Sequence, residues 1–114
     1  MTYQAALEKI RELAFPDYEE GRHSGAIAFK SHGRMFGTLR AVGSDGQIVV
    51  GLEPEHAATL IDRDPRFQPY PRAAHTVSLR VSQFKWREIE PLVRESEAIA
   101  TAAKARAKRG RRSR

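Results

Sequence analysis

The first apolar positions of the chain recur every three or four residues, the spacing of one face of a helix. They are Tyr3, Leu7, Ile10 and either Leu13 or Ala14. Thr2 can cap the first turn with its hydroxyl, and Pro16 disfavours helical backbone at the residue before it. The pattern therefore predicts a helix that ends close to Phe15. The acidic, glycine-containing segment 17–25 is predicted to be a loop.

Four later segments alternate apolar and polar residues, which is typical of strands with one buried face. They cover residues 26–30, 34–42, 47–52 and 76–81. A turn at 32–33 separates the first two, and the glycine-rich segment 43–46 is predicted to close a hairpin. The side chains expected to face the core are Ile27, Phe29, Ile48, Val50, Leu52, Val77, Leu79 and Val81.

Two more helices are predicted between and after these strands. Pro54 suits the first position of a helix that ends at Asp64-Pro65. The final helix carries Ile89, Leu92, Val93 and Ile99 on its buried side. Pro91 has no backbone N–H, so this helix should start within about one turn of it, with Trp86 covering the core nearby. The irregular stretch 65–75 is expected to be pinned to the core by Phe67 and Tyr70.

The elements follow one another in the order α-β-β-β-α-β-α. Alternating strands of this kind favour an antiparallel sheet with one covered face and one open face. We therefore predict an α+β fold of two layers, with the helices on one side of the sheet. The chain has 114 residues, which suits a single domain, placed here at residues 1–103.

The second strand leaves two alternatives for the open face. One exposes Phe36 together with Arg34 and Arg40, and the other buries all three, which costs desolvation. We adopt the first, allowing for a bulge at Gly37 that turns Phe36 inward. The open face then carries Lys30, Arg34, Arg40 and Arg80 around Phe36, with no carboxylate. Such a face is typical of a platform for single-stranded nucleic acid, although solvated sheets also use cations to prevent edge pairing.

The positive charge of the chain is concentrated at its C-terminal end. The net charge is +6, from 20 Lys and Arg against 14 Asp and Glu. Seven of these cations lie in the last eleven residues, namely Lys104, Arg106, Lys108, Arg109, Arg111, Arg112 and Arg114. Without them, 13 cations face 14 acids. We expect residues 104–114 to form a basic tail that is at least partly disordered, because like charges repel.

Several classes of function are excluded or disfavoured. The chain has no cysteine, which excludes disulfides, thiol catalysis and iron–sulfur clusters. The four histidines lack metal-ligand spacing, and Glu53-x-x-His56 is a single copy of a motif that di-metal bundles use in pairs. No nucleotide-binding or nucleophile motif is present. We therefore expect no catalytic residue, no metal and no cofactor, while an enzyme acting on a small anionic ligand beside Arg72 and His75 remains an alternative.

No apolar run approaches the roughly 20 residues of a membrane span, and the acidic and basic residues near the start do not suit a signal peptide. We therefore expect a cytoplasmic protein, and a monomer.

A series of short motifs runs along nearly the whole chain in a characteristic order. They are Phe15-Pro16, Glu19-Glu20-Gly21, Ala28-Phe29-Lys30, Gly33-Arg34-Met35-Phe36, Ile48–Leu52 followed by Glu53-Pro54-Glu55, Asp64-Pro65 and Val77–Val81. In this order they resemble the MmcQ/YjbR family of small proteins. The resemblance implies a two-layer fold of the secretion-chaperone-like type, similar to the double-wing module of a phage transcription factor. By that analogy it implies DNA binding.

Two functional hypotheses follow. The first is a non-enzymatic module that binds nucleic acid with little sequence preference, through the basic tail and the open sheet face. The alternative is an adaptor that binds a protein or peptide along the sheet edge or the loop Pro65–Tyr70, with Phe67, Tyr70 and Trp86 as anchors. Binding by charge weakens with salt, whereas binding by apolar anchors does not.

Overall fold

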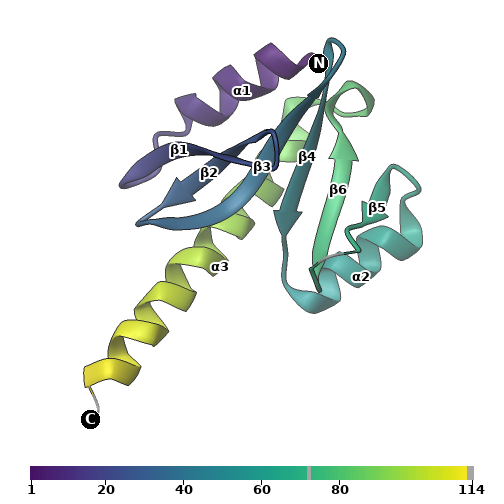
Figure 1. Cartoon of the computed structure of the whole chain (residues 1–114). Helices are drawn as coiled ribbons and strands as arrows, with labels where there is room; N and C mark the ends of the chain where they lie inside the picture. The colour runs from purple at the N-terminus through teal and green to yellow at the C-terminus, as the bar shows by residue number, and fades with distance from the viewer. Residues whose placement is uncertain (72, 113–114) are drawn as a thin grey trace.

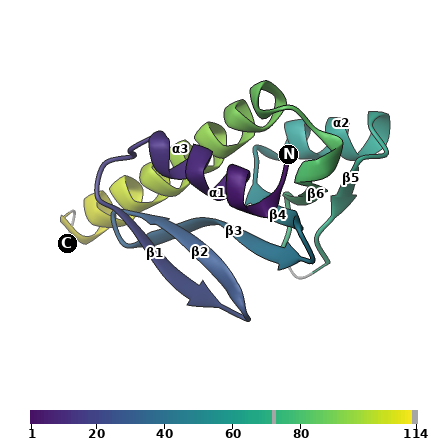
Figure 2. The ribbon, with the colours of Figure 1, turned by 90° about the horizontal axis from the view of Figure 1, so that it is seen from above.

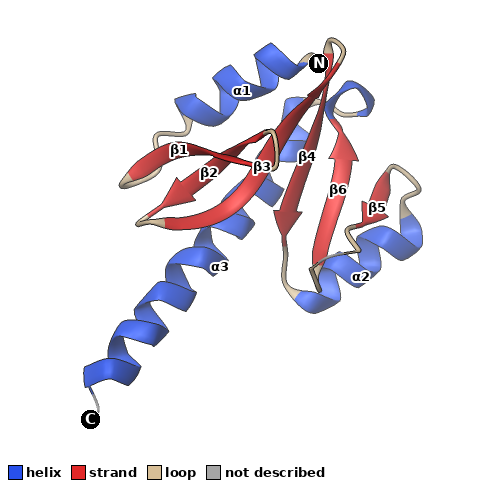
Figure 3. Ribbon diagram, viewed as in Figure 1, coloured by secondary structure: helices blue, strands red, loops and turns tan. Residues whose placement is uncertain are grey.

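The computed structural model describes residues 1–71 and 73–112, with side-chain surroundings as far as residue 105 (Figures 1 and 3). Its elements are α1 (Tyr3–Glu12), β1 (Tyr18–His23), β2 (Ala26–Ser31), β3 (Arg34–Val42), β4 (Asp45–Gly51), α2 (Pro54–Arg63), β5 (Phe67–Pro69), β6 (Thr76–Arg80), a short 3-10 turn (Val81–Gln83) and α3 (Trp86–Arg112).

The strands form one antiparallel sheet in the order β1-β2-β3-β4-β6-β5. Helices α1 and α3 lie on one side of this sheet, as Figure 2 shows, and α2 packs against β5 and β6 at one end. The other side of the sheet is open. The predicted α+β class, with an antiparallel sheet and helices on one side, is therefore confirmed.

The core lies between the sheet and the helices α1 and α3. Its largest fully buried aliphatic side chains include Ile10, Leu39, Ile48, Leu79 and Ile89. Seven of the eight strand residues predicted to face inward are buried, and the eighth, Ile27, packs partly buried against the same core. Burial of this apolar surface is the main favourable term in folding.

Segment 17–25, predicted to be a loop, contains the edge strand β1. Its side chains are mostly polar, so the alternation that marks a strand is absent. The strand is held instead by backbone pairing along the whole length of β2. Tyr18 also stacks on Phe29, with ring centroids 6.4 Å apart. The three-residue edge strand β5 was missed for the same reason, because pairing with β6 and not side-chain pattern defines it.

The helix ends mostly follow the predicted signals. Thr2 Oγ1 accepts a hydrogen bond from the Ala5 N–H at 3.1 Å, which caps α1. At the start of α3, Glu88 Oε1 accepts from the Lys85 N–H at 3.0 Å. Pro91 falls in the second turn of α3, slightly deeper than predicted. Trp86 is partly buried against the core, as expected.

A bulge in β3 sets the course of the sheet. Phe29 pairs with Gly37 while Lys30 pairs with Met35, so Phe36 is an extra residue on β3. Phe36 turns into the core, where it is 4% exposed and contacts Phe15 edge-on at 5.3 Å between ring centroids. The expected exposure of Phe36 is thus wrong, and the bulge allowed for at this point is confirmed.

Helix α3 continues without a break from the core into the basic segment. Its backbone is helical through Arg112, so it crosses the proposed boundary between residues 103 and 104. The division into a domain and a partly disordered tail stays a prediction. Ser113 and Arg114 lie outside the described residues. Over the described part of the chain, no helix combines the length and the apolar character that crossing a membrane requires.

The tight packing at Gly46 gives a test of the fold. A Cβ at Gly46 would lie 2.9 Å from Leu39 Cδ1 and 3.2 Å from the Tyr3 Cα. Gly46→Ala should therefore lower the free energy of unfolding by about 1–3 kcal/mol, measured by urea denaturation. Gly51→Ala is the matched control, because its Cβ would lie 3.8 Å from Thr76 Oγ1, an ordinary contact. Equal stability of the two variants would contradict this packing.

Candidate nucleic-acid interface

Three of the four cations predicted on the open face lie there. Arg40 pairs with Gln47, and Gln47 pairs with Arg80, so the two arginines share one row across β3, β4 and β6. Lys30 lies on the same face of β2, beside the buried Phe29 that points the other way. The open face thus has the predicted cations on three of its strands.

The prediction that this face carries no carboxylate is wrong. Glu19 on β1 stands opposite Lys30 in the register. Asp45 Oδ2 lies 3.4 Å from Arg80 Nη1. Both acids fall in segments that the sequence pattern assigned to loops, and both belong to strands. Because of these acids, the open face is far less positive than predicted.

The placement of Arg34 on the open face is also wrong. Arg34 pairs with Ser31, whose hydroxyl donates to Glu97 Oε2 of α3 at 2.8 Å. Residues paired across two strands point to the same face, so Arg34 lies on the side of the helices. The bulge at Phe36 causes this, because one extra residue reverses the alternation before it. Phe36 is buried, so no base can stack on it in this structure.

Asp45 organises one corner of the open face. Its side chain accepts hydrogen bonds from the N–H of Gly46 and from both the N–H and hydroxyl of Ser82. Partial burial raises the pKa of the Asp45 carboxyl, but these hydrogen bonds and Arg80 outweigh it and hold the pKa below its ordinary value of 3.8. Asp45 is thus ionised at neutral pH and tethers Arg80.

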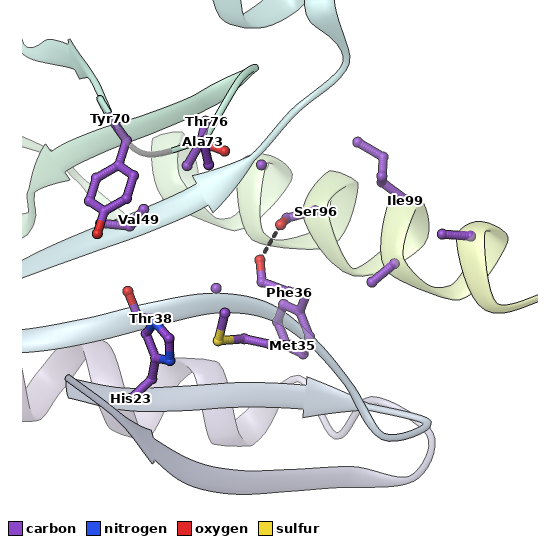
Figure 4. A pocket seen from close by; sticks show the side chains of 14 residues that line it. His23, Met35, Phe36, Thr38, Val49, Tyr70, Ala73, Thr76, Ser96 and Ile99 are labelled. Atoms are coloured by element: carbon purple, nitrogen blue, oxygen red, sulfur yellow. Dashed lines mark hydrogen bonds between the residues drawn. The ribbon is translucent and has the colours of Figure 1, made fainter. Parts of the chain in front are cut away.

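An apolar hollow of about 280 Å³ opens on the same side of the sheet. Strands β3 and β4 stay paired only as far as Gly37 and Val50, and β3 turns away at the bulge. Helix α3 lies behind this divergence and supplies Ser96, Ile99, Ala100 and Ala103 to the lining. The sheet contributes His23, Met35, Phe36, Gly37, Thr38, Val49, Gly51 and Thr76, and the loop before β6 adds Tyr70 and Ala73 (Figure 4).

Ser96 closes the inner end of the hollow. Its hydroxyl donates a hydrogen bond to the Phe36 carbonyl, which points toward α3 where β3 and β4 part (Figure 4). Ser96 is buried, so this bond satisfies a polar group that would otherwise lie unpaired in the interior. Met35 stands at the rim and is 46% exposed, which is high for a large apolar side chain.

Tyr70 separates this hollow from a second, more polar one. The second hollow, of about 680 Å³, is lined by Asp45, Arg80 and Gln68 among others. Tyr70 lines both hollows and therefore lies between them. The loop that carries it is held by the Tyr70 N–H, which donates to the Thr76 carbonyl at 3.0 Å.

Helix α3 is bound to the β2–β3 hairpin before and at the first residue of its basic segment. Glu97 accepts from Ser31, and Lys104 Nζ donates to the His32 carbonyl. The first tail cation is therefore docked on the body. Arg106, Lys108, Arg109, Arg111 and Arg112 follow on helical backbone, while their side chains and Arg114 lie outside what the structure describes.

Sequence reasoning missed the hollow itself. Its lining comes from β1, β3, β4, β6, α3 and the loop before β6, and no sequence spacing joins these segments. Two residues of the lining give weak hints in the sequence: Met35 is a large apolar residue in a polar stretch, and Gly51 leaves space because it has no side chain. Of the alternative enzymatic site, Arg72 lies outside the described residues. Within the described part of the chain, no three acidic or histidine side chains gather as a metal site would require.

A family model described as YjbR matches residues 13–96. The chain belongs to the YjbR family. The match spans all six strands and α2 and ends at Ser96, the residue that bonds to Phe36. It stops before the basic segment, so membership in the YjbR family carries no information about the C-terminal cations. The comparison with curated proteins found no match.

The tether between Asp45 and Ser82 predicts a pH-dependent contribution to stability. A carboxyl with a lowered pKa stabilises the fold above its ordinary pKa of 3.8, and this stabilisation is lost as pH falls through the lower folded value. Asp45→Asn should cost about 1–2 kcal/mol of unfolding free energy at neutral pH. The difference from the unmodified protein should shrink toward zero at strongly acidic pH.

Chemical denaturation at several pH values measures this difference. Asp62→Asn, the same change at an exposed position of α2, is the control and should alter stability little at any pH. A cost for Asp45→Asn that stays constant down to acidic pH would contradict the assigned role of the ionised carboxylate.

Proposed function

We propose that this protein binds nucleic acid with little sequence preference, through the basic C-terminal part of α3. The observation that carries the proposal is the continuity of that helix. Cationic residues 104–112 extend a helix whose preceding turns are packed in the core and tied to the β2–β3 hairpin. A helix anchored in this way presents its charges from a fixed base, projecting away from the sheet (Figure 1).

The charge distribution supports a polyanionic ligand. No acid follows Glu97, and seven cations fall within the last eleven residues. Phosphate contacts position a protein on nucleic acid without reading its sequence, and they supply most of non-specific affinity. The predicted interface residues on the open face, Lys30, Arg40 and Arg80, would add secondary contacts.

Five cations of the folded body form ion pairs with carboxylates, namely Lys9, Arg11, Arg66, Arg80 and Arg94. The basic segment has no acid of its own, so it should dominate binding. Arg11 forms a two-point contact with Glu20 at 2.7 Å, which holds the pKa of the Glu20 carboxyl below its usual value. Arg66 lies 2.8 Å from Asp64 and 3.0 Å from Glu88. The charges of a paired cation and carboxylate nearly cancel at a distance, so such a pair attracts a distant phosphate only weakly.

The alternative adaptor function finds less support. Phe67, one of its proposed anchors, is 5% exposed and packs on Phe84, and Trp86 is partly buried. Edge strand β5 has three residues and contains Pro69, and edge strand β1 is rich in charge. Short, charged or proline-containing edges disfavour strand addition. Tyr70 and Trp86 are half-buried, and Phe67 is buried.

The proposal predicts a steep salt dependence that resides in the basic segment. If all seven tail cations contact duplex phosphates, the logarithm of the affinity should fall with the logarithm of salt concentration with a slope of at most about −6. The test variant changes six residues to Gln: Arg106, Lys108, Arg109, Arg111, Arg112 and Arg114. Lys104 is retained because it contacts the body, so the slope should become shallower by about 5, the contribution of six phosphate contacts.

Fluorescence anisotropy with a labelled duplex at several salt concentrations gives these slopes. The matched control changes the five arginines of the same segment to Lys, which preserves charge and should preserve the slope. Gln and Lys are both good helix formers, so neither variant should unwind the helix. Duplex affinity that is independent of salt, or equal in the Gln variant and the original protein, would refute the proposal.

A further inference from the structure

The hollow between β3, β4 and α3 adjoins the basic segment directly. Ala100 and Ala103 form part of its wall, and the next residue, Lys104, begins the run of cations. The helical run from 104 to 112 is about 14 Å long at the usual rise per residue. A polyanion lying along this segment would therefore pass the mouth of the hollow.

The hollow has the chemistry of a site for a flat, uncharged ring. Among its described lining residues none is acidic, and most of the surface is aliphatic or aromatic. Tyr70, from the loop before β6, and His23, from edge strand β1, lie on opposite sides of it, and Thr38 and Thr76 line it as well (Figure 4). Rings of Tyr and His are surfaces on which unpaired bases stack, while hydroxyl groups can bond to base edges.

A base in a duplex is stacked and paired, so it cannot enter such a hollow without being extruded. A base in a single strand is free to do so. The volume of about 280 Å³ leaves room for one base, with the sugar and phosphates outside. The neighbouring phosphates would then lie against the cations that follow Ala103.

We propose that the hollow accepts one unpaired base of a single-stranded nucleic acid while the basic segment of α3 holds the adjacent phosphates. This inference rests on the proposed function and adds a preference for single strands. The complementarity of an acid-free apolar hollow to a base, next to a cationic helix, is the observation behind it.

Gly51 offers a way to fill the hollow without disturbing the fold. It lines the hollow, its φ lies outside the left-handed region, and an added Cβ would make only an ordinary contact with Thr76 Oγ1 at 3.8 Å. Gly51→Leu should therefore place a side chain where the base would lie. We expect it to weaken binding of a labelled single strand about tenfold, with no change in duplex affinity.

The matched control is Gly21→Leu, the same change on edge strand β1 outside both hollows. An added Cβ there would meet only the flexible end of Lys30 at 3.3 Å. Lys30 makes only a secondary contact in the proposed function, so both affinities should change far less than the tenfold loss expected for Gly51→Leu. Tyr70→Ala should weaken single-strand binding like Gly51→Leu, and Tyr70→Phe should restore it because the ring remains. Thermal unfolding of each variant reports whether the fold is kept.

The outcomes separate this inference from the proposed function. If Gly51→Leu leaves single-strand affinity unchanged while the Gln variant of the basic segment loses it, the hollow is not a base site and the proposed function stands. If neither strand form binds the original protein, both fail. Equal loss for single strand and duplex would also overturn the base site. The base site would also be overturned if Gly51→Leu abolished binding of an acidic peptide with one leucine anchor while single-strand binding persisted.

Discussion

The hydrogen bond from the Ser96 hydroxyl to the Phe36 carbonyl marks the constraint on which the rest of the structure depends. The bulge at Phe36 sends an aromatic ring into the core and turns β3 away from β4. Where the two strands part, the Phe36 carbonyl has no partner on β4, and a buried carbonyl needs a hydrogen-bond donor. Helix α3 supplies it, so the helix must lie across the opening. That position creates the apolar hollow and sets the direction of the basic segment.

Electrostatic pairing divides the molecule into two regions. On the body, two of the cations predicted on the open face have a carboxylate beside them: Asp45 pairs with Arg80, and Glu19 stands opposite Lys30. Beyond Glu97 no acid is available to do the same. The positive field is therefore concentrated on one end of α3. This division explains why the open sheet face, although it carries Lys30 and Arg40, is a weaker candidate for phosphate contact than the helix.

The two candidate features meet at Ala103. Toward the N-terminus, α3 forms one wall of the hollow, and toward the C-terminus it carries the cations. Apolar contact is short-ranged and sensitive to shape, whereas charge acts over about 10 Å in ordinary salt. A ligand that uses both must have a flat apolar part and a regular negative backbone, and a single-stranded nucleic acid has both. Membership in the YjbR family is compatible with this picture and does not by itself decide it.

Local patterns in the sequence determined the helices, the four alternating strands, the α+β class and the concentration of charge near the C-terminus. Each of these depends on neighbouring residues, through side-chain periodicity, capping or composition. Only the tertiary structure decided the edge strands β1 and β5, because pairing with another strand defines them and their side chains need not alternate. It also decided the faces of Arg34 and Phe36, since a single extra residue in β3 reverses the alternation. The hollow belongs to the same class: its walls are distant in the sequence, and they meet because buried groups such as the Phe36 carbonyl require a partner from another element.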